Sequence, residues 1–171
     1  MPKIETLYSK EVIQKRVLEV AGEINKDYGT GKELTVVGVL KGAFMFMSDL
    51  VKHLEMPVRC DFLRVVSYDH DVSTGNVRME FDLTQPVHDQ DVLLVEDIVD
   101  TGRTLRYLLE HIHAKKPRSL KVASLLYKDV GHVRELVNYV GFDVPNKYVI
   151  GYGLDSEGLY RSLPYVGVYK K

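Results

Sequence analysis

Two apolar runs predict strands that are buried on both faces. Val92 to Val95 are four consecutive apolar residues, whereas a strand with one wet face would alternate apolar and polar positions. Leu34 to Leu40 is a second such run and is rich in β-branched residues. Strands of this kind are typical of parallel sheets that carry helices on both faces.

Helical spacing appears on either side of these runs. From Ser9 to Tyr28 apolar residues recur at the period of an amphipathic helix, with Ser9 placed to cap it and Gly29 to end it. The spacing predicts further helices from Phe44 to Leu54 and from Thr104 to Ile112. Strands therefore alternate with helices through the first two thirds of the chain.

The remaining patterns predict shorter strands. Val58 to Val66 and Leu120 to Tyr127 read as further strands, and Val77 to Asp82 alternates like a hairpin partner with one wet face. The polar stretch 67–76 between two of them has the length of a lid or a disordered loop. The final third is different, because short segments rich in valine and tyrosine follow one another there: Tyr139 to Val144, Tyr148 to Tyr152 and Tyr165 to Tyr169.

Composition narrows the class of protein. A chain of 171 residues fits one domain, 1–171, and no linker or repeat divides it. Its 23 Lys and Arg balance 24 Asp and Glu, so it lacks the basic field on which nonspecific nucleic-acid binding depends. Cys60 is the single cysteine, and no apolar run has the length of a membrane span or a signal peptide. We expect a cytoplasmic protein without nucleic-acid or membrane partners.

The strand at Val92 to Val95 leads directly into candidate site residues. Glu96 and Asp97 follow it, and a turn of Asp100, Thr101, Gly102, Arg103 and Thr104 then precedes the predicted helix. In open parallel sheets ligands bind beyond the carboxyl ends of the strands. N–H groups at a helix start favour a phosphate, while carboxylates suit sugar hydroxyls or a magnesium ion. A sugar phosphate meets both conditions, although each residue taken singly fits an ordinary turn.

A similar arrangement follows the strand at Leu34 to Leu40. Lys41 and Gly42 lie between that strand and the next predicted helix, where a lysine and helix N–H groups offer a second place for an anion. By itself this signal is weak, because most such lysines are simply exposed. Neither loop has the spacing of a Walker A motif or of G-x-G-x-x-G.

The run E-D-I-V-D-T-G-R-T resembles the signature of the type I phosphoribosyltransferases. Together with L-K-G, the pair S-Y, S-L-L-Y-K and Y-V-I-G-Y-G-L-D-S-E-G-L-Y-R, it resembles the hypoxanthine phosphoribosyltransferases from Ser9 onward. The resemblance implies an α/β fold with a central parallel sheet flanked by helices. It also implies a small β-rich hood, which we expect to be formed mainly by residues 139–171 with the N-terminal segment.

The resemblance further implies transfer of ribose 5-phosphate from phosphoribosyl pyrophosphate to hypoxanthine or guanine, with Mg²⁺ as cofactor. Asp100 is the implied catalytic base, and Ser67 and Tyr68 are implied to lie on a mobile loop. The residues implied to bind phosphoribosyl pyrophosphate are Lys41, Gly42, Glu96, Asp97, Asp100, Thr101, Gly102, Arg103, Thr104 and Arg161. The residues implied to bind the purine are Lys128, Tyr148, Val149 and Asp155, and those implied to hold metal are Glu96, Asp97 and Asp155.

Several details accompany this resemblance. A cis peptide is expected at Leu40–Lys41, and self-association as a dimer or tetramer is expected from similar enzymes. Tyr148 stands where many family members have phenylalanine, and Arg103 where lysine is frequent. Two alternatives stay open: a non-catalytic regulator that senses phosphoribosyl pyrophosphate or a nucleotide, and a transferase for a pyrimidine base. The combination of Lys128, the implied donor for the oxygen at purine C6, with Tyr148 argues against the second.

Overall fold

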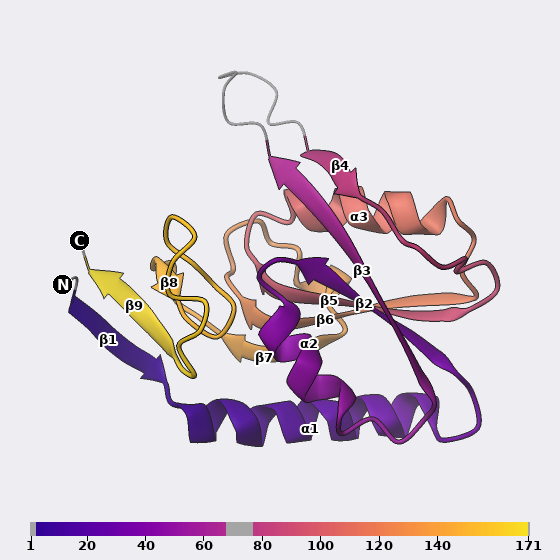
Figure 1. Cartoon of the computed structure of the whole chain (residues 1–171), viewed down its shortest axis with the longest axis horizontal. Helices are drawn as coiled ribbons and strands as arrows, with labels where there is room; N and C mark the ends of the chain where they lie inside the picture. Colours follow the sequence, from indigo (N-terminus) through magenta and orange to yellow (C-terminus); the bar gives the residue numbers. More distant parts are fainter. Residues whose placement is uncertain (1–2, 68–76, 171) are drawn as a thin grey trace.

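The computed structural model describes residues 3–67 and 77–170 of the chain (Figure 1). Tyr68, one of the two residues expected on a mobile loop, lies outside these residues, and Ser67 is the last residue of a strand. The elements in chain order are β1 (Lys3–Tyr8), α1 (Lys10–Tyr28), β2 (Leu34–Leu40), α2 (Phe44–Val51), β3 (Val58–Ser67), β4 (Val77–Phe81), β5 (Asp91–Val99), α3 (Arg103–His113), β6 (Ser119–Tyr127), η1 (Arg134–Leu136), β7 (Tyr139–Asp143), β8 (Val149–Ile150) and β9 (Val166–Lys170).

The larger sheet has the strand order β4-β3-β2-β5-β6-β7. The pairs β2–β3, β2–β5, β5–β6 and β6–β7 are parallel, and only β4 runs antiparallel to its neighbour, β3. The strands β2 and β5 occupy the middle of this sheet, as their apolar runs predicted. The fold class predicted from the sequence is therefore confirmed.

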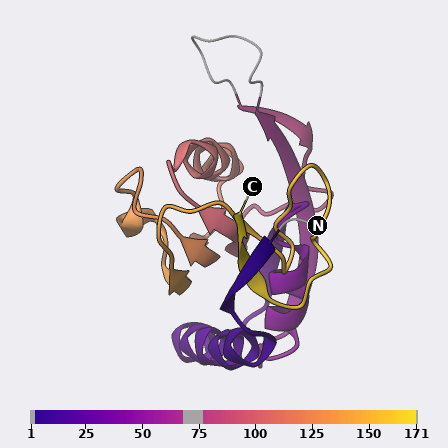
Figure 2. The ribbon, with the colours of Figure 1, turned by 90° about the vertical axis from the view of Figure 1, so that its left-hand side faces the viewer.

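Helices cover both faces of this sheet. Because successive side chains of a strand point to opposite faces, alternate residues of its strands pack against different helices. On one face Val36 and Leu93 join a hydrophobic cluster with residues of α1 and α2, among them Phe46. On the other face Val37 and Leu94 join a second cluster with residues of α3. Figure 1 and Figure 2 show α1 and α3 on opposite sides of the sheet.

The helix ends follow local signals in the sequence. Ser9 caps α1 by accepting a hydrogen bond from the Val12 N–H at 3.4 Å, and Gly29 ends it with φ of 66°. By contrast, α2 ends at Val51, three residues before the expected Leu54. The described chain has no helix of sufficient length and apolarity to cross a membrane.

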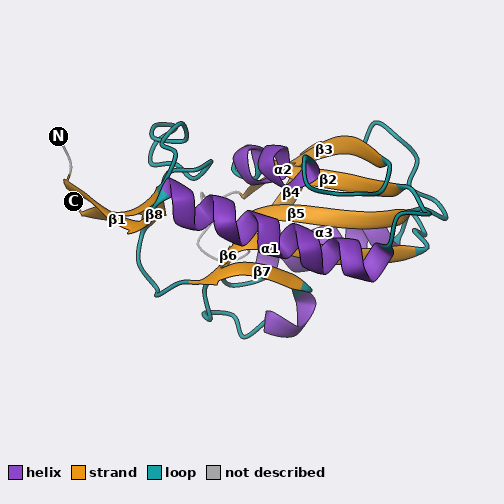
Figure 3. Ribbon diagram, turned by 90° about the horizontal axis from the view of Figure 1, so that it is seen from below, coloured by secondary structure: helices purple, strands orange, loops and turns teal. Residues whose placement is uncertain are grey.

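A second, smaller sheet has the order β1-β9-β8 and forms the hood. The N-terminal strand β1 pairs antiparallel with β9, from Lys3 opposite Lys170. Figure 3 shows this sheet beyond one end of α1, away from the middle of the larger sheet. The hood was expected to be formed mainly by about residues 139–171 with the N-terminal segment. At the start of this range, β7 pairs in parallel with β6 and buries Tyr139 and Val140 in the larger sheet. An edge strand of a parallel sheet has the same valine and tyrosine content as a hood strand.

Candidate active site

The carboxyl ends of β2 and β5 open into a cleft of about 320 Å³. Two segments contribute to its lining: the L-K-G loop, residues 40–42, and the motif E-D-I-V-D-T-G-R-T, which begins in β5 and continues after it. The hood closes the cleft from the other side. The predicted residues that line it are Lys41, Gly42, Glu96, Asp97, Asp100, Gly102, Thr104, Asp155 and Arg161. Segments far apart in the sequence thus meet at one edge of the sheet, as the parallel topology requires.

A second cleft of about 290 Å³ adjoins the first. Lys128, Tyr148 and Val149, the residues expected to bind a base, line it together with Leu154. The two clefts share Asp97, Ile98, Asp100 and Asp155 as lining residues. A ligand with a phosphorylated sugar and a ring could therefore span both clefts across this shared wall.

Gly42 lets the L-K-G loop pass directly against Asp97. A Cβ atom at Gly42 would lie 1.5 Å from Asp97 Oδ2, so no other residue fits there without moving the carboxylate. The peptide between Leu40 and Lys41 is cis, as expected. Lys41 itself is exposed at the rim of the cleft, where its ammonium group can reach an anion.

The turn after β5 presents N–H groups at the start of α3. Gly102 is the residue before this helix and has φ of 76°, a left-handed conformation that favours glycine. The Thr101 N–H donates to the Asp100 carboxylate, and the Arg103 N–H donates to Thr101 Oγ1 at 3.5 Å. The helix begins at Arg103, one residue before the expected Thr104. Thr101 and Arg103 are exposed and lie outside the cleft lining.

Glu96 and Asp97, the acidic pair, lie in an environment that disfavours negative charge. Glu96 is 5% exposed, and burial together with the nearby Asp97 and Asp100 raises its pKa well above the usual range of a glutamate. Burial also raises the pKa of Asp97, although a hydrogen bond from the Ile98 N–H at 2.8 Å and the charge of Arg161 oppose this rise. Ligand hydroxyls or a cation would relieve this repulsion.

These carboxylates fit a magnesium ion that takes further ligands from a bound molecule. Within residues 3–67 and 77–170, no three His, Cys, Asp or Glu side chains gather closely enough to hold a metal alone. Magnesium commonly uses one or two protein carboxylates together with water and substrate phosphates. The Glu96 carboxylate makes no hydrogen bond or ion pair with a described residue, so its oxygens remain available to a ligand.

The hood places Asp155 and Arg161 over the first cleft. Arg161 forms an ion pair with Asp155 at 2.8 Å and donates to the Gly153 carbonyl at 2.6 Å. The Gly158 N–H holds the other carboxylate oxygen of Asp155 at 2.7 Å. Both side chains are therefore held in place by contacts within the hood.

The second cleft has an aromatic ring and a cation of contrasting exposure. Tyr148 is 55% exposed, and its hydroxyl donates to the Asp155 carbonyl at 3.1 Å. The Tyr169 ring lies edge-on at 5.9 Å and limits its movement. Lys128 is partly buried, which lowers its pKa, while the charge of Asp100 opposes this change. The ring can stack on a flat ligand, and the ammonium group can donate to an oxygen.

Two contacts that support the site were not predicted from the sequence. A Cβ atom at Gly153 would lie 2.0 Å from the Gly42 carbonyl oxygen, so the hood touches the L-K-G loop backbone to backbone. The Tyr152 hydroxyl donates to Asp49 Oδ2 at 2.6 Å and ties the hood to α2. The glycine of the hood motif was a sequence signal for the first contact, whereas nothing in the sequence pointed to Asp49.

Comparison with known proteins identifies the family. Residues 3–157 match the phosphoribosyl transferase domain. The chain is 42% identical to the hypoxanthine-guanine phosphoribosyltransferase of Dictyostelium discoideum, over 98% of this chain and 96% of that protein. It is 44% identical to the enzyme of that name from Bacillus subtilis, over 97% of this chain and 93% of the relative.

Solved structures agree with these sequences. The hypoxanthine phosphoribosyltransferase of Trypanosoma cruzi superposes with a TM-score of 0.90 at 41% identity and covers 97% of this chain and 91% of its own. A hypoxanthine-guanine phosphoribosyltransferase of Bacillus anthracis superposes with a TM-score of 0.88 at 36% identity, over 98% and 99% of the two chains. The fold, the paired clefts and these relatives together show that the chain belongs to the hypoxanthine-guanine phosphoribosyltransferase family.

Proposed function

We propose that this chain transfers the 5-phosphoribosyl group from phosphoribosyl pyrophosphate to hypoxanthine and guanine in purine salvage. The products are inosine or guanosine monophosphate and pyrophosphate. The observation that carries the proposal is the pair of adjoining clefts with a common acidic wall. One cleft has the features that bind a sugar phosphate, the other has those that bind an oxopurine, and the wall between them is where the two would be joined.

At the edge of the first cleft, the N–H groups at the start of α3 bind the 5-phosphate. Gly102 and Thr104 line the cleft there, and Thr101 and Arg103 approach the phosphate from just outside the lining. Glu96 and Asp97 accept hydrogen bonds from the ribose hydroxyls and so hold the ring in place. The leaving pyrophosphate lies against the side chains of Lys41 and Arg161, which balance its charge. The backbone of Gly42 contacts it beside Lys41.

Magnesium held by the pyrophosphate with Glu96 and Asp97, and a second magnesium held with the help of Asp155, would supply further neutralisation of the leaving group. The ion pair of Arg161 with Asp155 at 2.8 Å places this arginine beside the proposed metal ligands. Both the pyrophosphate and the carboxylates would then have a positively charged partner when substrate binds.

In the second cleft, Tyr148 stacks on the purine ring and Lys128 donates to the oxygen at C6. Backbone groups of Val149 and Asp155 contact the opposite edge of the base. Adenine has an amino group at C6, which would oppose the Lys128 ammonium group with another donor. The arrangement therefore supports oxopurines over adenine.

The reaction is a displacement at the anomeric carbon. The bond from C1′ to the pyrophosphate oxygen breaks, the leaving group takes the electron pair, and purine N9 forms the new bond to C1′. Asp100 accepts the proton that the base loses from N7, because it lies on the wall shared by both clefts. A carboxylate there also stabilises the positive charge that develops on the ribose.

A non-catalytic regulator is less well supported by this site. Such a protein could bind the ribose phosphate without contacts to a pyrophosphate or metal, whereas Lys41, Asp155 and Arg161 all line the first cleft. A cytoplasmic location and assembly into a dimer or tetramer are part of our proposal and rest on the family resemblance. Gel filtration with light scattering tests the assembly.

The direct test is an initial-rate assay by ultraviolet absorbance with phosphoribosyl pyrophosphate and magnesium. Hypoxanthine, guanine, xanthine and adenine are offered separately. We expect magnesium-dependent turnover of oxopurines and none of adenine. Turnover of adenine alone would contradict the role of Lys128. Binding of phosphoribosyl pyrophosphate without turnover of any base would favour the regulator.

A further inference from the structure

The turn between β6 and η1 lies against the phosphate loop, residues 100–104. It follows Lys128 and runs from Asp129 to Val133. None of its residues has a role in the proposed reaction. The Lys128 N–H donates to the Val99 carbonyl at 2.8 Å, and the Gly131 N–H donates to the Asp100 carbonyl at 3.1 Å. These two backbone hydrogen bonds attach Lys128 to the end of β5 and the turn to the first residue of the phosphate loop.

Gly131 lies directly against the backbone of the phosphate loop. A Cβ atom at this position would lie 2.2 Å from the Thr101 carbonyl oxygen and 2.4 Å from its carbonyl carbon. Both atoms belong to the backbone, so they cannot turn aside as a flexible side chain would. Any side chain at Gly131 must therefore displace the phosphate loop or the turn.

Val133 supports the same loop from a second point. It is 0% exposed, and both its methyl carbons lie 2.7 Å from the place that a Cβ atom at Gly102 would occupy. Gly102 is the left-handed residue from which the phosphate-binding N–H groups of α3 begin. The Val133 side chain therefore packs against Gly102, whose backbone conformation sets the direction of these N–H groups.

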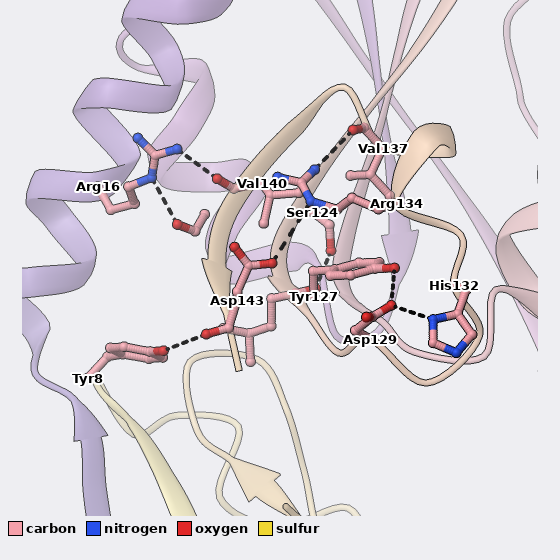
Figure 4. A network of polar contacts seen from close by, with 12 residues as sticks. Tyr8, Arg16, Ser124, Tyr127, Asp129, His132, Arg134, Val137, Val140 and Asp143 are labelled. Atoms are coloured by element: carbon pink, nitrogen blue, oxygen red, sulfur yellow. Dashed lines mark hydrogen bonds and ion pairs between the residues drawn. The ribbon is translucent and has the colours of Figure 1, made fainter. Parts of the chain in front are cut away.

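The turn is itself fixed to the end of β6 (Figure 4). The Tyr127 hydroxyl donates to Asp129 Oδ1 at 3.2 Å, and His132 Nδ1 lies 3.1 Å from the same oxygen. The Arg134 guanidinium lies over the Tyr127 ring at 5.5 Å from its centre. These contacts give the turn a defined position relative to Lys128, which directly precedes it.

We infer that the turn Asp129–Val133 positions the phosphate loop relative to Lys128, with Gly131 as the main positioning residue. This inference rests on the proposed function, because it assigns the phosphate loop to phosphoribosyl pyrophosphate and Lys128 to the base. The backbone contact at Gly131 sets the distance between the two groups. A sugar phosphate and a base bound at the two clefts then meet with the separation that bond formation needs.

The test compares Gly131→Ala with the control Gly22→Ala. Gly22 lies in α1 and a Cβ atom there meets nothing within 4 Å. We measure KM for phosphoribosyl pyrophosphate, kcat, and the Kd of ribose 5-phosphate by calorimetry. Relief of the 2.2 Å contact needs a shift of about 1 Å, and a misplacement of that size can cost about 100-fold in rate. We expect kcat/KM for phosphoribosyl pyrophosphate to fall by about 10- to 100-fold in Gly131→Ala, with a rise in KM and in the Kd of ribose 5-phosphate, and all three to stay unchanged in Gly22→Ala.

A purely structural role would give a different result. It would lower the folded fraction and hence the maximal rate, while KM and Kd of the folded molecules stayed at the wild-type values. That outcome overturns the inference. If Gly131→Ala does not fold, Val133→Ala replaces it and should raise the same two constants by about threefold or more; unchanged constants there also overturn it.

The ribose 5-phosphate measurement separates this inference from the proposed function. Absence of turnover in the wild-type protein would count against the transferase. The positioning role would then be judged by the Kd of ribose 5-phosphate alone. Wild-type turnover together with an unchanged Kd in folded Gly131→Ala would retain the transferase and reject the positioning role.

Discussion

Replacement of Gly42 by alanine tests the contact between the L-K-G loop and the acidic pair. The new methyl group would lie 1.5 Å from Asp97 Oδ2 and 2.4 Å from its Cγ. Ordinary van der Waals contact begins at 3.4 Å, so the carboxylate must move by about 2 Å if the loop stays in place.

The loop has little freedom to move instead. A Cβ atom at Gly153 would lie 2.0 Å from the Gly42 carbonyl, so the hood blocks a retreat of the loop on that side. Asp97 carries the displacement and also loses its hydrogen bond from the Ile98 N–H at 2.8 Å. A misplacement of about 1 Å can cost about 100-fold in rate, so we expect kcat/KM for phosphoribosyl pyrophosphate to fall by at least about 100-fold.

Stability should change much less than activity. Overpacking of a buried site costs about 1–3 kcal/mol, and each kcal/mol lowers Tm by about 2–4 °C in a domain of this size. The variant should thus remain folded at 25 °C, where the rates are measured. Gly22→Ala is the matched control: we expect wild-type kinetics and a gain of about 0.5–1 kcal/mol, since alanine is the better helix former.

The assay is the initial rate by ultraviolet absorbance, at varied phosphoribosyl pyrophosphate and saturating hypoxanthine. Circular dichroism confirms that Gly42→Ala is folded. A folded Gly42→Ala protein with kcat/KM within threefold of the wild type would refute the reasoning. It would mean either that the L-K-G loop adapts freely or that the position of Asp97 does not matter to the reaction.

Three further predictions concern the charged residues of the site. Asp100→Asn should keep substrate binding and lose about 10²- to 10⁴-fold in kcat, which single-turnover kinetics can measure. Wild-type turnover in this variant would exclude Asp100 as the base. Lys128→Ala should raise KM for hypoxanthine by about 10- to 100-fold, with a smaller change for phosphoribosyl pyrophosphate; equal losses would argue against a contact with the base. Glu96→Gln should raise the free energy of unfolding of the unliganded protein at pH 8. The folded pKa of Glu96 is raised, so its charge costs stability once the pH exceeds the unfolded pKa near about 4.3. Urea unfolding at pH 5 and pH 8 should show the gain shrink at pH 5, and an equal gain at both would contradict this cause.

The sequence predicted the local elements well where one signal dominates. The apolar run Leu34 to Leu40 has the same bounds as β2, and Ser9 and Gly29 flank α1 as expected. The predictions from the sequence were less accurate where one pattern of apolar residues fits more than one structure. Leu54 continues the helical spacing after Val51, yet the helix stops at Val51, because packing rather than periodicity decides where a short helix ends.

The candidate site was also largely predictable, because its motifs are long and lie at the ends of strands. Glu96 and Asp97 were expected just after the strand but lie in the last residues of β5, and Asp100 follows it. Parallel topology brings all three to the same edge of the sheet as Lys41. The contacts that fix these residues were not predictable. Gly131 and Val133 show no pattern of their own, since their importance depends on a loop about thirty residues away in sequence.

The sequence by itself therefore determined the alternation of strands and helices, the acidic pair, the phosphate loop and the family. The elements and the charged positions depend on residue type and on spacing along the chain, which local physical chemistry can read, whereas the family followed from the resemblance of its motifs. Only the tertiary structure decided that β7 joins the larger sheet, that β1 pairs with β9, and that Gly42, Gly131 and Gly153 touch backbone or carboxylate across the site. Such contacts join segments that are distant in sequence, and they arise only when the whole core packs in one arrangement.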